Sequence, residues 1–227
     1  MPSAARSPAR GAAIAGRFAA PGADCHAIAG SVLRRPERMG QLFECLHSGK
    51  AEVRYGSAKV LRLISERSPG LLYPHFDLFF RLFEGENTIH RWGATQILGN
   101  LAAVDEAGKF EAVLDRFLRP ILGHEMIGAA NVIAAAAKVA AAKPALAGRI
   151  ASAILGVEGA RYKTPECRNV AIGHAIRAFD RIYPLVPDRK PVFEFVTRQL
   201  ENTRPATRRK AEQFRRRWGL KPAPRGR

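Results

Sequence analysis

The sequence predicts an all-α fold, a solenoid of about five helical hairpins that stack side by side. Two observations carry this prediction. First, a segment with a small residue followed by apolar residues at helical spacing returns along the chain. Its copies are separated by 36, 37, 41 and 39 residues and start at Val53, Ile89, Met126, Cys167 and Ala206. Second, an apolar helical segment precedes each copy, so the repeating unit is a pair of helices.

The two clearest copies, residues 53–61 and 89–98, align when the small residues Ser57 and Ala94 coincide. This register superposes the arginine and the aromatic residue of each copy, namely Arg54 and Tyr55 with Arg91 and Trp92. The small residue is expected where two helices approach closely. The segments that begin at Val53 and Ile89 are therefore predicted to be the second helices of two hairpins.

A first helix is predicted ahead of each copy. The five candidates are rich in apolar residues at helical spacing and cover residues 41–46, 76–83, 110–122, 147–155 and 192–200. An isolated pair of such helices cannot bury both apolar faces. Successive pairs must therefore pack on one another and share one continuous core.

The combination of Val-Arg, a small residue and leucine at helical spacing resembles HEAT and armadillo repeats, and the chain is similar to small prokaryotic HEAT-repeat proteins. The resemblance covers roughly residues 36 to 218. It implies a right-handed α-solenoid whose second helices line a concave face. It implies little chemistry, because a fold does not determine a function.

The expected domain organisation has three parts. Residues 1–23, rich in alanine, glycine and proline, are predicted to be a disordered leader, with an organelle transit peptide as the alternative. Residues 24–218 are predicted to form the solenoid, starting with a capping helix near residues 25–35. Residues 219–227 are expected to be a loose basic tail. Within the solenoid, Thr164 followed by Pro165 is a strong helix-start signal.

The net charge is +17 and the predicted isoelectric point is near 10.8. The last 24 residues hold ten basic side chains and one acid, a net +9, which leaves +8 for the preceding 203 residues. Any attraction to a polyanion is therefore expected to concentrate at the C-terminal end.

The cysteines Cys25, Cys45 and Cys167 are far apart and odd in number, which favours neither a disulfide framework nor a zinc site. The reducing cytoplasm is the expected location. Residues 126–142 are mostly apolar, but Asn131 and Lys138 interrupt them, so no membrane span is predicted. No cofactor and no small-molecule substrate is indicated.

The first candidate site is a set of rows along the predicted concave face that would grip a protein partner. Aromatic and arginine side chains commonly dominate binding energy. The candidate residues are Arg54, Tyr55, Lys59, Arg62, Arg91, Trp92, Gln96, His174 and Arg177. In the alternative interpretation, Arg54 and Arg91 tie helix ends to the acids Glu52 or Glu86, and the two aromatic rings pack in the core.

The second candidate site is the last helix, whose many arginines would neutralise phosphates of DNA or RNA. The candidate residues are Arg208, Arg209, Lys210, Arg215, Arg216 and Arg217. Alternatively, these charges only solvate the outer face of a terminal repeat. The sequence shows no interleaved aromatic pattern of the kind that stacks bases, which argues against sequence-specific RNA recognition.

Catalytic motifs are absent from the sequence. The six histidines show no paired-ligand spacing, and no GxSxG, P-loop or GxGxxG segment is present. The resemblance to HEAT-like folds extends to DNA alkylation-repair glycosylases, whose cleft is basic with tryptophans and one carboxylate. This sequence has Trp92 but no Trp-Trp-Asp cluster.

The preferred hypothesis is a non-enzymatic, cytoplasmic scaffold that binds a protein partner along its concave face. A nucleic-acid-binding solenoid that uses the basic C-terminal helix is the alternative, and a DNA-glycosylase-like activity is a distant third.

Overall fold

The computed structural model describes residues 12–20 and 22–219, and within them the protein is all-α with no strand. The chain divides into two compact units, residues 1–104 and 105–227. The sequence predicts one solenoid over residues 24–218, whereas the structure divides the chain after Val104.

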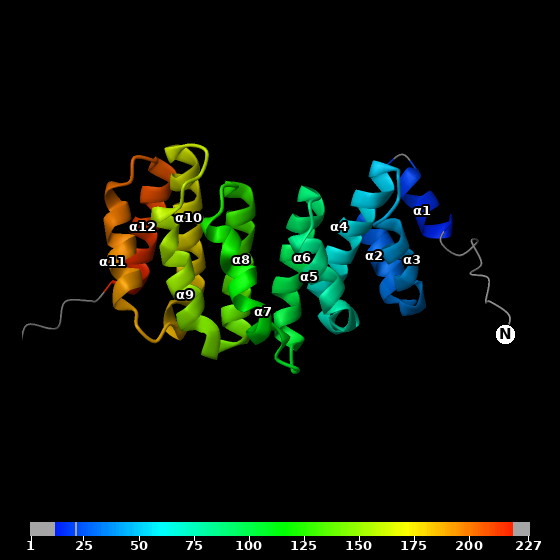
Figure 1. Cartoon of the computed structure of the whole chain (residues 1–227), viewed down its shortest axis with the longest axis horizontal. Coiled ribbons are helices and arrows are strands. Elements are labelled where there is room, and N and C mark those ends of the chain that lie inside the picture. The colour runs from blue at the N-terminus through cyan, green and yellow to red at the C-terminus, as the bar shows by residue number, and fades with distance from the viewer. Residues whose placement is uncertain (1–11, 21, 220–227) are drawn as a thin grey trace, which may run out of the picture. The chain divides into compact units, whose positions relative to one another are not determined.

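The first unit contains six of the described α-helices. They are α1 (Ala12–Ala19), α2 (Cys25–Leu33), α3 (Met39–Cys45), α4 (Ala51–Arg67), α5 (Phe76–Glu84) and α6 (Thr88–Leu101). Short 3₁₀ turns connect or extend them at Pro36–Arg38, Pro69–Leu71, Tyr73–His75 and Ala102–Val104. Helices α2, α4 and α6 lie side by side in chain order, while α3 packs on α4 and α5 packs on α6 (Figure 1).

The second unit contains the other six described helices. They are α7 (Lys109–Leu118), α8 (Met126–Ala142), α9 (Ala147–Leu155), α10 (Pro165–Ile182), α11 (Lys190–Arg198) and α12 (Pro205–Trp218). Its 3₁₀ turns are Arg119–Leu122, Pro144–Leu146, Gly156–Gly159, Tyr183–Leu185 and Gln199–Glu201. Helices α8, α10 and α12 lie side by side in chain order, and α9 packs against both α8 and α11 (Figure 1).

Local sequence signals explain where several helices begin. Thr164 accepts a hydrogen bond from the main-chain N–H of Cys167 at 3.1 Å, and Pro165 occupies the first helical position of α10, as predicted. Asn87 caps α6 in the same way, because its side chain accepts from the N–H of His90 at 3.1 Å. Helices occupy the ten predicted positions, as α3 to α12, although the helix predicted over residues 110–122 ends at Leu118 and continues as a 3₁₀ turn.

Apolar residues spaced three or four positions apart on these helices build the core of each unit. In the second unit the fully buried rings of Phe110 and Phe117 pack edge to face with their centres 5.5 Å apart, and Phe179 packs on Phe195 in the same way. Aromatic pairs in this arrangement contribute about 0.5–1.5 kcal/mol beyond the area that they bury. The long helix α8 is instead packed through small residues such as Ala136 and Ala140.

The prediction of a disordered leader over residues 1–23 needs correction. Residues 12–19 form α1, in which Ile14 and Phe18 are buried, and this helix packs on α3 and α4. The physical reason lies at Gly56 of α4: a Cβ there would be 2.6 Å from Phe18 Cδ1, so the glycine makes room for the ring. Residues 1–11 and 21 lie outside the described part of the chain. The expected tail falls almost wholly outside it too, since only Gly219 is described.

Candidate functional site

Arg54 and Tyr55 contact each other and their neighbours within the first unit. Arg54 donates a hydrogen bond from Nη1 to the main-chain oxygen of Ser48 at 2.7 Å, and its guanidinium lies 4.8 Å from the centre of the Tyr55 ring. Its Nη2 reaches the Tyr55 hydroxyl at 3.4 Å. The bracing role that we considered for Arg54 therefore has a carbonyl as its partner rather than the expected Glu52.

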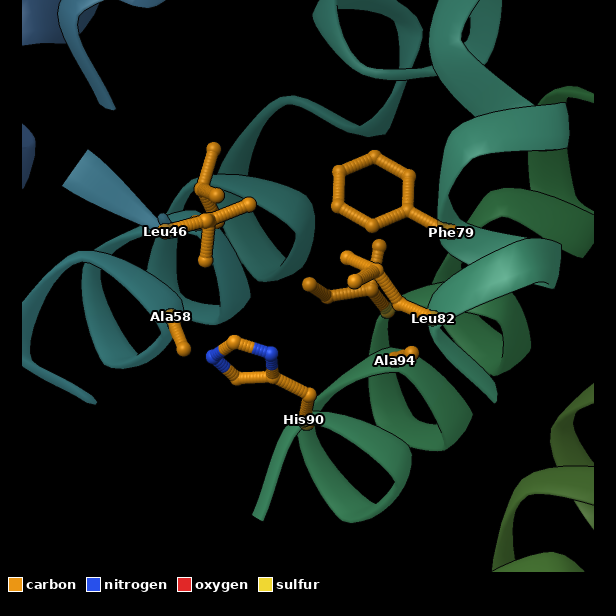
Figure 2. A pocket seen from close by; sticks show the side chains of 9 residues that line it. Leu46, Ala58, Phe79, Leu82, His90 and Ala94 are labelled. Carbon is orange, nitrogen blue, oxygen red and sulfur yellow. The ribbon is translucent and has the colours of Figure 1, made fainter. Parts of the chain in front are cut away.

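Tyr55 also meets His90 of α6 edge to face at 6.0 Å. Figure 2 shows the imidazole of His90 extending from α6 toward Ala58 of α4, at a small cavity of about 10 Å³. The cavity is about the size of one water molecule and its other lining residues are apolar, so it is a packing gap rather than a ligand site. Burial lowers the pKa of His90, and the nearby charge of Arg54 lowers it further.

The other candidates of the first unit have different surroundings. Arg91 donates to the Thr88 hydroxyl at 3.3 Å, within its own helix. Arg62 forms an ion pair with Glu66 one turn along α4. Trp92 and Gln96 are half-buried, and Lys59 is exposed. The indole N–H of Trp92 is buried without a hydrogen-bond partner among the described residues.

His174 and Arg177 belong to the second unit, where the structure brings them to Lys210. Helix α12 places the Lys210 side chain over Gly173 of α10, with its Nζ 2.8 Å from the position that a Cβ on that glycine would take. His174 is the next residue of α10, and Arg177 lies one turn further along the same helix. Three basic side chains from two helices therefore gather at the α10–α12 contact. We call these three residues the basic cluster.

Two residues of the basic cluster, Lys210 and His174, have lowered pKa values. Lys210 is half-buried, and burial is the main cause of its lowered pKa, followed by the charges of Arg177 and Arg204. Burial likewise lowers the pKa of His174, and the charges of Lys210, Arg177 and Arg204 add to the effect. Across residues 12–20 and 22–219, the side chains of Lys210 and Arg177 make no hydrogen bond or ion pair. Arg204, in contrast, pairs with Glu166 at 2.7 Å. The cluster is positive and lacks a counter-ion from the described chain.

Three of the six predicted polyanion-binding residues are engaged within the second unit. Arg208 donates to the main-chain oxygen of Asn202 at 2.8 Å. Arg217 pairs with Asp180 at 3.0 Å, and Arg215 lies 5.8 Å from the centre of the Phe193 ring.

Arg209 and Arg216 are exposed, and the described part of the chain offers them no hydrogen-bond partner or counter-ion. Together with Lys210 they are the predicted residues whose side chains have no hydrogen bond, ion pair or ring contact in the described part of the chain. Phosphate contacts of this kind need basic groups that are accessible and not already neutralised.

Sequence reasoning did not find the role of Gly173. A glycine inside a helix lowers helix stability by about 1 kcal/mol relative to alanine, so its presence in the middle of α10 was a usable signal of a close approach. A group of aromatic side chains at the end of the second unit was also not predicted from the sequence. It consists of Tyr183, Phe193 and Trp218.

Other kinds of site find little support. No group of three or more histidine, cysteine, aspartate or glutamate side chains lies close enough to hold a metal ion among the described residues. Cys25, Cys45 and Cys167 are free thiols. Among residues 12–20 and 22–219, no helix is both long enough and apolar enough to cross a membrane.

Comparison with known proteins gives no further guide to function: no protein-family model matches the chain, and no curated protein is significantly similar to it.

Proposed function

We propose that this protein is a non-enzymatic, HEAT-like repeat protein of the cytoplasm that binds nucleic acid through α10 and α12. The ordered packing of second helices in each unit supports the repeat interpretation, with each unit a stretch of right-handed α-solenoid. The three free cysteines are compatible with a reducing compartment.

The observation that carries the proposal is the unpaired basic cluster. Holding Lys210 half-buried beside Arg177 and His174 opposes folding, because like charges repel and burial removes water from them. A phosphate placed at the cluster would neutralise these charges. Arg209 and Arg216 extend the accessible positive charge along α12. The net charge of +17 adds long-range attraction to a polyanion.

The test uses point variants of the full chain, since α12 carries the buried residues Ala211 and Phe214 and its removal would expose the core. The variant Arg209→Gln/Lys210→Gln/Arg216→Gln removes three accessible cations. If each contacts one phosphate, the slope of log affinity against log salt for DNA should fall by about 3.

A matched control removes three exposed cations of the first unit, in the variant Lys59→Gln/Arg67→Gln/Arg81→Gln. It changes the net charge equally, so it should weaken DNA binding only through the long-range field and leave most of the salt slope intact. An unmodified chain that leaves a heparin column at low salt would refute nucleic-acid binding. Equal effects of the two triple variants would refute the assignment to α12.

A protein partner on the first unit is the second candidate function. It is favoured by Ile89, which is 43% exposed, and by the half-buried Trp92 one turn along the same face of α6. The double variant Ile89→Ala/Trp92→Ala should abolish capture of such a partner while changing the melting temperature little. A large fall in melting temperature would assign the two side chains to the core instead.

A further inference from the structure

Three aromatic side chains from separate elements line one pocket at one end of the second unit. Tyr183 follows α10, Phe193 belongs to α11 and Trp218 ends α12. They line an open cavity of about 470 Å³, together with Arg189, Lys190 and Glu194. This volume lies in the range of about 300–1,000 Å³ that is usual for small-molecule sites. We call it the aromatic pocket.

The rings are held in place by neighbours. Tyr183 is buried and packs edge to face on the fully buried Phe214, with the ring centres 5.0 Å apart. Trp218 lies 5.3 Å from Tyr183, and its indole N–H donates to Asp180 at 2.8 Å. Phe193 and Trp218 are both half-buried, so each presents part of its ring to solvent. The pocket is therefore a preformed surface rather than one that a ligand must assemble.

Each ring of the pocket also has a cation beside it. The guanidinium of Arg189 lies 5.7 Å from the centre of the Tyr183 ring, and no acid of the described chain pairs with it. The guanidinium of Arg217 lies 4.9 Å from the centre of the Trp218 ring, but Asp180 neutralises its charge. The guanidinium of Arg215 lies 5.8 Å from the centre of the Phe193 ring. The one acid that lines the pocket, Glu194, lies 3.9 Å from the ammonium of Lys190.

Aromatic faces with cations at the rim fit a ligand that has a flat π surface joined to a negative group. A nucleotide is such a ligand, because its base stacks on aromatic rings and its phosphate attracts arginine. An acidic peptide would be attracted by the cations but would make no use of the rings.

We propose that the aromatic pocket receives an unpaired base, which stacks on Phe193 and Trp218, so that the protein prefers single-stranded nucleic acid to duplex. This inference rests on the proposed binding of nucleic acid and names the form that is bound. Bases inside a duplex are already stacked and paired, and drawing one out costs a few kcal/mol. The duplex can reach the arginines but not the pocket.

The experiment uses tryptophan fluorescence of the full chain. The chain has two tryptophans, Trp92 and Trp218, so the variant Trp92→Phe leaves Trp218 as the only one. A single-stranded DNA oligonucleotide and a duplex of the same length are titrated into it at one salt concentration. We expect the single strand to quench Trp218 emission and to bind about tenfold more tightly, and the duplex to bind with unchanged emission.

The variant Phe193→Ala removes one stacking surface and should weaken single-strand binding about tenfold while leaving duplex binding unchanged. Phe193→Leu, which keeps most of the apolar volume but has no π surface, should weaken single-strand binding in the same way. It replaces the alanine variant in the test if that variant does not fold. Phe43→Ala is the matched control, since Phe43 is a half-buried phenylalanine of the first unit. It should leave both affinities unchanged.

The outcomes separate the two proposals. Equal affinity for both forms, with steady Trp218 emission, would overturn the stacking of a base and leave nucleic-acid binding by α12 intact. No binding of either form would refute both. Tighter binding of the single strand, lost in both Phe193 variants and kept in the Phe43 control, is the result that supports the pocket.

Discussion

Two helical glycines, one in each unit, show how the same local device leads to different surfaces. Gly56 of α4 makes room for the ring of Phe18, and Gly173 of α10 makes room for the ammonium of Lys210. The first contact buries an apolar side chain and packs α1 on the rest of the first unit. The second places a charge over a helix with no counter-ion from the described chain. A close approach of a side chain to a helical glycine can therefore bury an apolar ring in one unit and leave an unneutralised charge in the other, depending on which side chain packs there.

The largest stability effect is expected at the first glycine. Gly56→Ala places a methyl group 2.6 Å from a ring carbon of Phe18, so α1 must shift, at a cost of about 1–3 kcal/mol in the free energy of unfolding. Gly93, the aligned residue of α6, has nothing within 4 Å, and Gly93→Ala should stabilise by up to about 1 kcal/mol. Urea denaturation of the two variants checks the difference. Equal values would show that Phe18 does not depend on the glycine.

The second glycine should affect binding more than stability. In Gly173→Ala the new methyl group meets the mobile end of Lys210, and the hydroxyl of Thr207 at 3.0 Å. The Thr207 hydroxyl is fully buried, so the free energy of unfolding should fall by about 1 kcal/mol, the lower end of the range for overpacking. DNA affinity should fall, because the ammonium is displaced from the basic cluster. Heparin retention measured beside urea denaturation tests both parts, and unchanged retention would remove Gly173 from the proposed site.

Replacing the lysine itself should separate stability from function. Lys210→Met removes a half-buried charge from beside Arg177 and His174 while keeping an apolar stem, so the fold should gain about 0.5 kcal/mol, comparable to the relief of one like-charge pair. The same variant should bind DNA more weakly. Thermal denaturation and a DNA titration measure the two effects. A loss of stability would show that the Lys210 ammonium has a partner in the folded protein.

The pH dependence of stability gives the smallest expected effect. The folded pKa of His174 lies below its usual value of 6.5, because the imidazole is buried beside cations. The unfolded chain therefore takes up the proton first. The free energy of unfolding should fall as pH drops from 7 through the range just below 6.5.

The variant His174→Gln tests this expectation, since it should flatten the decrease. His90 in the first unit, whose pKa is also lowered, should account for much of the remaining slope. An identical slope in the variant and in the unmodified chain would show that His174 titrates in the same way folded and unfolded.

Much of the fold was predictable from the sequence, because helices are encoded by local patterns. Apolar spacing and the start signal Thr164-Pro165 placed the ten helices from α3 to α12 close to their observed positions. The missed helix, α1, has only two buried anchors, Ile14 and Phe18, in a segment rich in alanine and glycine. Its composition is that of a linker, and its packing on α3 and α4, with Phe18 over Gly56, is seen only in the tertiary structure.

The candidate site was predictable in composition but not in detail. The excess of arginine pointed to α12, yet only the structure showed that Arg217 is neutralised by Asp180 while Arg209 and Arg216 are not. The aromatic pocket was out of reach, because Tyr183 and Trp218 are 35 residues apart in the chain and meet only after α10 and α12 pack together.

The sequence by itself therefore determined the helices, their order and the total charge, since each is a property of neighbouring residues or of composition. Tertiary structure decided which cations are paired and which rings share a pocket. The physical reason is that the rotation and spacing of packed helices set the distances between side chains far apart in sequence, and electrostatic and stacking energies depend on those distances.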